Sequence, residues 1–262
     1  MKLPSIFAAA VLLLVAQPTG AHADIRFGIA AEPFPPFLFK DASGQWVGWE
    51  ADVMAALCKQ IGETCIMRET AWDGLIPALE AKQFDVIWAS MAITDKRREA
   101  IGFTHWYYNT RVFLIGAKTG DRDILPGHFS GKAIGVQVGT IHERYVQKYF
   151  APAAAVVKTY ATQDEAQQDL AAGRIDYVQG AAAGLDGFLK SDEGKACCEL
   201  KGAVPMDAAI LGEGVGGGLR KDDAALKAKL DAGLAAMAKA GAFDAITAKY
   251  PGLGDFIFTP KE

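Results

Sequence analysis

The sequence has few of the features that mark a membrane-spanning, nucleic-acid-binding or metal-dependent protein. No apolar run approaches the ~18 residues that a membrane-spanning helix needs. Lys and Arg number 27 against 31 Asp and Glu, for a formal net charge of −4, and basic residues form no cluster. We therefore expect no nucleic-acid partner. The four cysteines and four histidines lack metal-ligand spacing. Because Walker and Gly-x-Ser-x-Gly motifs are also absent, we expect no metal and no cofactor.

The N-terminal segment is typical of a secretory signal peptide. A basic start at Lys2 precedes a wholly apolar stretch over 6–16, and the small-residue pattern Ala21-His22-Ala23 follows. The apolar stretch is too short to span a bilayer, which argues against an anchor. We expect residues 1–23 to be removed by cleavage after Ala23, leaving a soluble periplasmic protein.

Cysteine placement agrees with export to an oxidising compartment. Cys58 ends an expected helix and Cys65 opens the next expected strand, so a disulfide across this turn is geometrically easy. Cys197 and Cys198 are adjacent. They form either a vicinal disulfide, which we favour, or a pair of small buried thiols.

Apolar strands alternate with amphipathic helices along the chain, and the series starts again near residue 132. This alternation predicts an α/β protein with two lobes, each built on a parallel sheet. Ligands of such sheets bind outside the carboxyl ends of the strands, which places the expected site in a cleft between the lobes. The expected strands are 24–30, 65–68, 85–88, 112–117, 132–136, 156–159 and 176–178, and the expected helices include 51–61, 73–82, 141–150, 165–172, 183–190 and a long one from 222 or 223.

The segment from Ala89 to Arg97 is the first candidate site. A buried strand ends there, a short loop exposes backbone N–H groups, and a helix begins after Thr94. Free amides at a helix N-terminus bind anions, and an arginine in the first turn can hold a carboxylate with two hydrogen bonds. The alternative is that Arg97 pairs with Asp95 or Glu99 in solvent.

The second candidate site is the junction around Gly139. Thr140 and Glu143 fit a capping box at the start of a helix, and the amides of Thr140 and Ile141 would point into the cleft. An ordinary strand–helix junction would have the same sequence. His142 is either a ligand contact or, as we favour, an exposed residue of the first turn.

Two aromatic residues on loops form a third candidate. Phe34 lies on the proline-rich loop 33–37, and Trp72 precedes Asp73-Gly74. Aromatic walls at strand ends suit stacking on a planar or cationic group of a ligand. Packing within one lobe is the alternative role.

The chain resembles the family-3 solute-binding proteins of bacterial ABC importers, of the polar amino acid and opine type. The resemblance runs over nearly the whole chain after residue 23. It is carried by Gly48-Trp-Glu-Ala-Asp-Val53, Trp72-Asp-Gly-Leu-Ile-Pro-Ala-Leu79, Ala89–Thr104, Val136–Thr140, Ala172–Asp176 and Gly218–Asp222. Trp49 and Ala51 depart from the usual residues of the first motif. The Cys58 and Cys65 pair matches the disulfide of the histidine- and lysine/arginine/ornithine-binding members.

The resemblance implies the type II periplasmic binding fold, with two lobes that close about two crossing segments near 110–112 and 210–214. Lobe 1 would comprise 24–111 and 213–262, and lobe 2 would comprise 112–212. It also implies a monomer that delivers a carboxylate-bearing small molecule to an inner-membrane ABC permease. Arg97 would bind the carboxylate, with help from the amides of Ser90, Ala92 and Ile141 and from the hydroxyl or amide of Thr140. Phe34 takes the place of a stacking tyrosine, and Trp72 would wall the side-chain end. The expected ligand-binding set is completed by Glu32, Ala89, Gln137 and Gln179.

Two departures bear on the ligand. Members that bind amino acids hold the α-ammonium with an acid in the region that here reads Gln179-Gly-Ala-Ala182. The first-loop acid used for cationic side chains aligns with Ala31, one residue before Glu32. Because a buried unpaired ammonium costs several kcal/mol, we expect a ligand with a carboxylate but an altered, substituted or absent α-amino group.

The competing function is a periplasmic enzyme similar to the cyclohexadienyl dehydratases, which share the fold. Such an enzyme needs a general acid in the cleft. Glu32 and His142 are the nearby candidates, and neither lies in a recognisable catalytic motif. We therefore expect a binding protein without catalysis. A fused sensor or receptor is disfavoured because the chain shows no membrane-spanning run.

Overall fold

The computed structural model describes residues 24–153 and 155–261. The segment expected to be a signal peptide lies outside these residues. Within them, no helix combines the length and the apolarity needed to cross a membrane.

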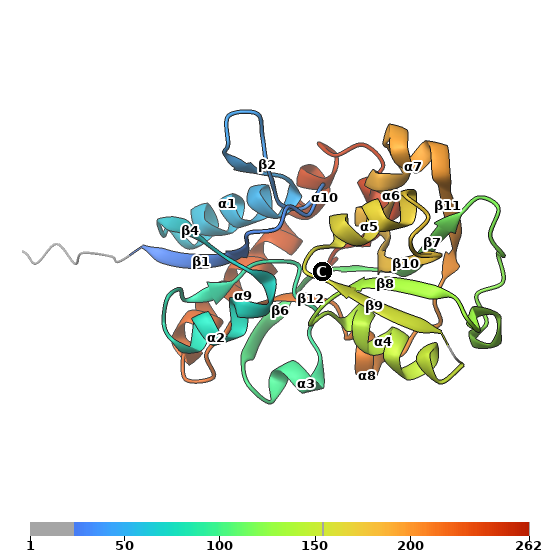
Figure 1. Ribbon diagram of the computed structural model, residues 1–262. Helices are drawn as coiled ribbons and strands as arrows, with labels where there is room; N and C mark the ends of the chain where they lie inside the picture. The colour runs from blue at the N-terminus through green and yellow to red at the C-terminus, as the bar shows by residue number, and fades with distance from the viewer. Residues whose placement is uncertain (1–23, 154, 262) are drawn as a thin grey trace, which may run out of the picture.

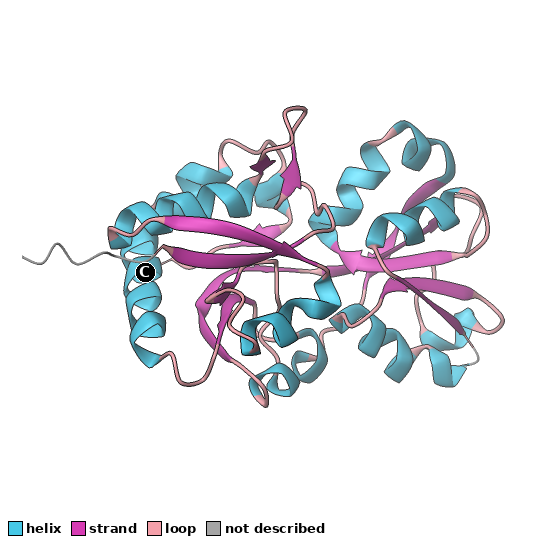
Figure 2. Ribbon diagram, turned by 60° about the vertical axis from the view of Figure 1, so that its left-hand side comes forward, coloured by secondary structure: helices cyan, strands magenta, loops and turns pink. Residues whose placement is uncertain are grey.

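The chain forms two α/β lobes side by side, each with a central sheet between helices (Figures 1 and 2). The larger sheet has the strand order β13-β6-β12-β5-β1-β4, and the smaller has the order β11-β7-β10-β8-β9. In both, the neighbouring strands β1, β4 and β5, or β8, β9 and β10, run parallel. Strands β6, β12, β7 and β11 pair antiparallel, so the sheets are mixed rather than wholly parallel.

The first lobe carries the N-terminal and C-terminal parts of the described chain. Its elements are β1 (Ile25–Ala30), β2 (Phe39–Lys40), β3 (Trp46–Val47), α1 (Trp49–Ile61), β4 (Cys65–Thr70), η1 (Trp72–Gly74), α2 (Leu75–Glu80), β5 (Val86–Ile87), α3 (Asp95–Arg98), β6 (Gly102–Thr110), β12 (Val215–Leu219), α9 (Ala224–Lys239), α10 (Ala242–Thr247), η4 (Leu253–Asp255) and β13 (Ile257–Phe258).

The second lobe is formed by the middle of the chain. Its elements are β7 (Val112–Ala117), η2 (Pro126–Phe129), β8 (Ala133–Gln137), α4 (Ile141–Tyr149), η3 (Ala151–Ala153), β9 (Val156–Tyr160), α5 (Gln163–Ala171), β10 (Tyr177–Ala181), α6 (Ala182–Lys190), α7 (Asp192–Cys197), β11 (Cys198–Ala203) and α8 (Ala208–Leu211).

The chain crosses between the two sheets twice. Arg111 alone separates β6 of the first sheet from β7 of the second. Residues 212–214 lead from α8 back to β12. We therefore keep 24–111 with 213–262, and 112–212, as the working division of the chain into lobes.

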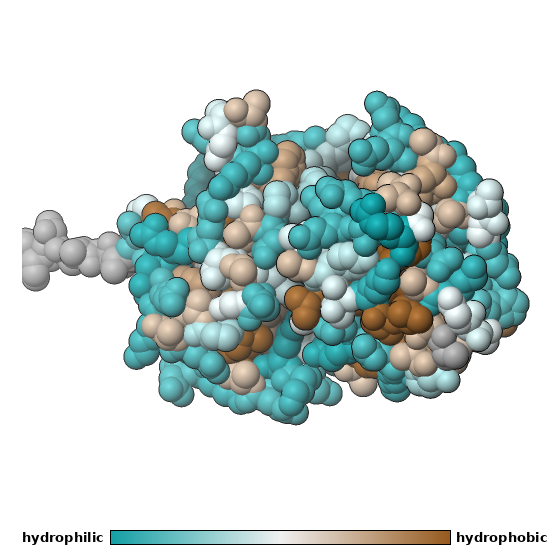
Figure 3. All heavy atoms as spheres, in the orientation of Figure 1, coloured by the Kyte–Doolittle hydropathy of each residue, from teal (hydrophilic) through white to brown (hydrophobic). Residues whose placement is uncertain are grey.

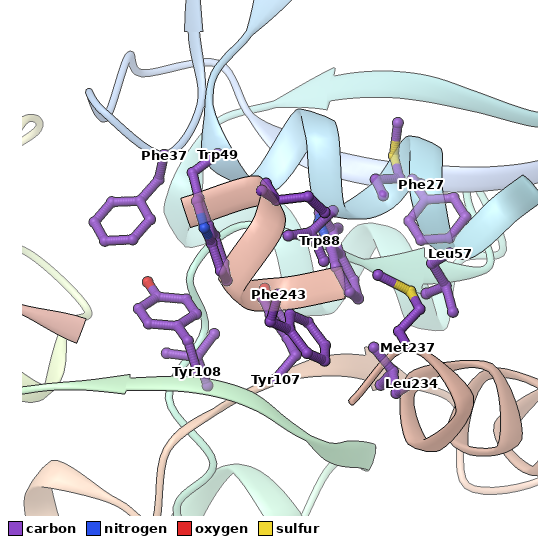
Figure 4. Packing of buried hydrophobic residues seen from close by; sticks show 14 of the residues in the cluster. Phe27, Phe37, Trp49, Leu57, Trp88, Tyr107, Tyr108, Leu234, Met237 and Phe243 are labelled. Atoms are coloured by element: carbon purple, nitrogen blue, oxygen red, sulfur yellow. The ribbon is translucent and has the colours of Figure 1, made fainter. Parts of the chain in front are cut away.

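An aromatic cluster fills the core of the first lobe and supports one wall of the cleft (Figure 4). Trp88 stacks on Tyr107 with ring centroids 4.1 Å apart. Phe37 stacks on Tyr108 at 4.9 Å, and Phe34 of the proline-rich loop stacks on Phe37 at 5.2 Å. Aromatic pairs of this kind fix ring positions more strictly than aliphatic packing does. The loop that carries Phe34 is thereby held against the core.

Both pairs of cysteines are disulfide-bonded. Cys58–Cys65 joins the end of α1 to the start of β4, as the sequence predicts. Cys197–Cys198 is the vicinal disulfide, at the junction of α7 and β11. The alternative of two reduced thiols at the second pair is therefore not what the structure contains.

The face of the molecule shown in Figure 3 is mostly polar, with apolar residues in small groups.

Candidate functional site

A cavity of about 470 Å³ lies between the two lobes. It is lined by loops that follow the carboxyl ends of strands in the first sheet, by the start of α4 and by the hinge. Ten of the eleven residues that the sequence places at the ligand site line it, namely Glu32, Phe34, Trp72, Ala89, Ser90, Ala92, Arg97, Gln137, Thr140 and Ile141.

Gln179 is the exception, and its expected place in the site is corrected here. Its side chain is only 1% exposed, lies away from the cavity lining, and has no hydrogen-bond partner in the described part of the chain. The expected strand ended at Val178, whereas β10 continues to Ala181, which does line the cavity. At ~3.3 Å per residue, Gln179 lies about 7 Å deeper in the lobe than the cleft edge of the strand.

Arg97 is buried in the cleft and does not pair with acids in solvent. Its side chain is 6% exposed, and Glu99, one of the alternative partners, pairs with Lys96 instead. Thr94 caps α3 by accepting a hydrogen bond from the Arg97 backbone amide, which orients the residue at the helix start. The guanidinium lies 5.3 Å from the centre of the Trp72 ring.

The guanidinium of Arg97 connects the two lobes. It donates to the carbonyl of Ala92 in the first lobe at 2.9 Å and to the carbonyl of Gly139 in the second at 3.4 Å. Burial and the nearby Arg144 lower the pKa of Arg97 to about 9, so it is cationic at neutral pH. Among the described residues, Arg97 has no carboxylate within ion-pair distance. The site therefore holds a buried positive charge without a counter-ion.

The start of α4 faces Arg97 from the second lobe. Thr140 accepts a hydrogen bond from the Glu143 amide at 3.2 Å and donates to the carbonyl of Gln137 at 2.7 Å. Of the two groups expected at Thr140, the hydroxyl is occupied by the cap, which leaves its amide as the group available to a ligand. The amides of the first helical turn have no intrahelical acceptors, and they remain the groups that this junction offers an anion.

His142 is part of the cavity lining rather than an exposed residue of the first turn. Although part of the residue is accessible, its Nδ1 is enclosed and has no hydrogen-bond partner among the described residues. Burial, and then the charge of Arg97, lower the pKa of His142 to about 3, so the ring is neutral at physiological pH.

The Ser90 amide, which was expected to face a ligand, has a partner within the protein. The Ser90 amide donates to the carboxylate of Glu50 at 2.8 Å and its hydroxyl donates to the same carboxylate at 2.7 Å. Tyr107 donates a third, short hydrogen bond to Glu50. Ser90 has a positive φ of 53°, which is uncommon for a residue other than glycine. Glu50 therefore holds the loop 89–92 in shape, and burial raises the pKa of its carboxyl.

Glu32 brings a carboxylate into the cleft beside Trp72. Both of its oxygens accept from the Trp72 backbone amide, at 3.2 and 3.1 Å. The acid that the sequence places one position from the family pattern thus lines the cavity. In contrast, positions 179–182 supply no charged side chain.

Sequence reasoning missed the hinge side of the site. Asn109, Arg111, Gln163, Met206 and Phe258 also line the cavity. These residues come from the end of β6, the chain crossing, α5, the loop between β11 and α8, and β13, which no local motif connects. The two lobes also contact each other across the cleft, because Phe34 of the first lobe lies against α6 of the second at Gly184.

A buried arginine between two closed α/β lobes defines a small-molecule binding protein whose ligand is enclosed by both lobes. Residues 25–253 match the family model described as bacterial extracellular solute-binding proteins, family 3. The chain belongs to this family.

Curated relatives match over almost their full length. The L-arginine-binding protein of Pseudomonas aeruginosa is 37% identical over 252 residues, covering 95% of this chain and 96% of that protein. The histidine-binding periplasmic protein of Salmonella typhimurium is 36% identical over 244 residues, covering 92% and 94%.

Solved structures give the same picture of the fold. An ancestral arginine-binding protein bound to arginine is 31% identical, with a TM-score of 0.79, covering 87% of this chain and 98% of that one. A periplasmic binding protein from Silicibacter pomeroyi in complex with lysine is 29% identical, with a TM-score of 0.75, covering 87% and 97%. The two-lobe type II fold expected from the sequence is confirmed.

Proposed function

We propose that the chain is the periplasmic solute-binding component of an ABC importer. It captures a small carboxylate-bearing solute between its lobes and delivers it, as a monomer in the closed form, to an inner-membrane permease. The buried, uncompensated guanidinium of Arg97 carries this proposal. Names of relatives that bind arginine and histidine support a solute of amino-acid type.

The carboxylate of the solute binds at Arg97. Two of the five guanidinium N–H groups already donate to the carbonyls of Ala92 and Gly139, and three remain for the solute. The positive end of α4, with the amides of Thr140 and Ile141, adds to the attraction from the second lobe. The Trp72 ring covers the guanidinium and keeps water from it.

The rest of the solute differs from a plain α-amino acid. No acid faces the cleft from positions 179–182, so an α-ammonium there would be buried without a partner at a cost of several kcal/mol. Glu32 suits a cationic group at the far end of the solute. We infer a solute with a carboxylate and a substituted, altered or missing α-amino group, such as an opine or an N-substituted amino acid.

Catalysis by a dehydratase-type mechanism is disfavoured by the chemistry of the two candidate acids. Because its pKa is lowered to about 3, His142 is a neutral imidazole at neutral pH and cannot act as a general acid. Glu32 already accepts from the Trp72 backbone amide through both of its oxygens. Neither group is prepared to protonate a leaving group.

A ligand screen with matched arginine variants tests the function. Thermal shift and calorimetry would measure plain arginine, lysine and histidine, opines, N-substituted amino acids and small organic acids. Binding to the native state alone raises stability by mass action, so a ligand at 100 times its Kd adds ~2.7 kcal/mol. Arg97→Ala should weaken the best ligand about 30-fold or more, because truncating one partner of a buried charge pair costs ~2–5 kcal/mol. Arg98→Ala is the control, since Arg98 is exposed and pairs with Glu213.

Two outcomes would contradict the proposal. Unchanged affinity in the Arg97→Ala variant would place the ligand elsewhere. Turnover of prephenate or arogenate by the wild-type protein would support the enzyme instead. Tight binding of plain arginine, lysine or histidine would leave the transport role standing but refute the inference about the α-amino group.

A further inference from the structure

A second arginine lines the same cavity at the hinge. Arg111 is the single residue between β6 and β7, and its backbone carbonyl accepts hydrogen bonds from the Ala182 amide at 2.9 Å and the Thr110 hydroxyl at 3.3 Å. These contacts fix its backbone to both lobes. Its guanidinium lies 5.8 Å from the centre of the Phe258 ring, and both residues line the cavity.

The side chain of Arg111 has no counter-ion. Among the described residues it forms no ion pair and donates no hydrogen bond. The two carboxylates that line the cavity are already engaged: Glu50 accepts from Ser90 and Tyr107, and Glu32 accepts from the Trp72 amide. Two arginines therefore line the cavity without an ion-pair partner among the described residues: Arg97, which is buried, and Arg111, which is exposed.

The position of Arg111 over the Phe258 ring leaves its guanidinium available to an anion. A guanidinium held over a ring face keeps its N–H groups directed outward in its own plane, where they fit the two oxygens of a carboxylate. The ring is half-exposed, so this contact does not seal the charge inside the protein.

We propose that Arg111 binds a second carboxylate, so that the solute is a dicarboxylate held between Arg97 and Arg111. The inference rests on the proposed function and narrows its ligand class. A cavity of about 470 Å³ lies within the ~300–1,000 Å³ typical of small-molecule sites, so it can hold a solute that reaches both groups. Because a carboxylate has lone pairs left when it accepts one amide, Glu32 can still accept from a cationic arm. The matching chemistry is that of two amino or keto acids joined through one secondary amine.

Pairs of compounds that differ only in the second carboxylate test this proposal. Octopine is compared with N-isopropylarginine, in which a methyl group replaces that carboxylate, and glutarate is compared with glutaramate. Calorimetry on the full protein measures each Kd. The dicarboxylate of at least one pair should bind 10-fold or more tightly than its partner. In Arg111→Gln the ratio of the two Kd values should shrink to about 2-fold or less, and any general weakening of the site cancels in that ratio.

Control variants separate this effect from general electrostatics and from the proposed function. Arg68→Gln removes the same charge from an exposed residue of β4 and should keep the preference. Arg97→Ala should weaken both members of a pair. The proposal is overturned if only monocarboxylates bind, if both members bind equally, or if the preference survives in Arg111→Gln; in each case the transport role still stands. Failure of every carboxylate to bind would instead overturn the proposed function, and the inference with it.

Discussion

Closure of the cleft depends on one glycine opposite an aromatic ring. A Cβ atom at Gly184 of α6 would lie 2.6 Å from Cε2 of Phe34, closer than real Cβ contacts come. The Phe34 ring cannot simply turn away, because it stacks on Phe37, which stacks on Tyr108 in the core. We therefore predict that Gly184→Ala opposes the closed form and weakens ligand binding.

The magnitude follows from the steric conflict. Inserting a methyl group into a well-packed contact costs typically ~1–3 kcal/mol. The contact crosses the cleft, so the cost falls on the closed form and not on either lobe alone. A free-energy cost of ~1–3 kcal/mol corresponds to a loss of affinity of about 5- to 150-fold.

The matched control lies three residues further along the same helix. Gly187 is exposed, and a Cβ there meets nothing within 4 Å. Both glycine-to-alanine changes raise the helix propensity of α6 by a similar amount, up to ~1 kcal/mol. The difference in ligand affinity between the two variants therefore reports the steric clash at Gly184. Calorimetry gives Kd, and denaturation without ligand shows that the lobes remain folded. If the Gly184→Ala variant binds the ligand as tightly as the Gly187→Ala variant, then the contact between Phe34 and α6 is not present in the ligand-bound form.

Three further predictions concern stability. Glu50→Gln places an amide among donors that now point at a carboxylate, and should lower the unfolding free energy in urea by ~1–3 kcal/mol, whereas the exposed Glu80→Gln should change it by less than ~0.5 kcal/mol. The pKa of His142 is lowered to about 3 in the folded state, from its ordinary value of 6.5. Between pH 3 and pH 6.5 the unfolded chain therefore binds more protons than the folded one. The unfolding free energy should fall as pH drops through that window, by up to ~1.4 kcal/mol per pH unit, and His142→Asn should flatten the profile; parallel profiles would contradict the burial argument. The double variant Cys58→Ala/Cys65→Ala should lose ~2–4 kcal/mol, and an unchanged urea midpoint would show that the bond adds nothing.

The Arg97 side of the site could be predicted because its sequence signal is local. A buried strand, a short loop, a capping threonine and an arginine follow one another between Asp85 and Arg97, and the structure folds them as that order implies. The clamp on Ser90 was not predictable in the same way. Glu50 and Tyr107 lie 40 and 17 residues away from Ser90 along the chain, and only the tertiary packing of α1 against β6 brings the three together.

Errors in strand limits explain most of what the sequence analysis misplaced. Because the strand after Asp176 was ended three residues early, Gln179 was assigned to the cleft instead of the lobe core. The sequence analysis predicts neither strand β6 nor the short β13. It therefore does not place Arg111 and Phe258, which lie at the ends of these strands, in the lining of the cavity. Strands that form only by pairing with distant segments of the chain have no hydrophobic periodicity of their own in the sequence.

The empty closed form carries an electrostatic cost that a ligand removes. Closing the lobes brings the carbonyl of Gly139 to Arg97, which satisfies one N–H group, but a carbonyl cannot neutralise the charge. Arg144 approaches Arg97 from the second lobe and adds repulsion on closure. Under the proposed function, a carboxylate bound between them would cancel both effects and would therefore bind the closed form more tightly than the open one. Since a ligand shifts a conformational equilibrium only by its differential affinity, anions should close this protein, and neutral analogues of the same shape should bind without closing it.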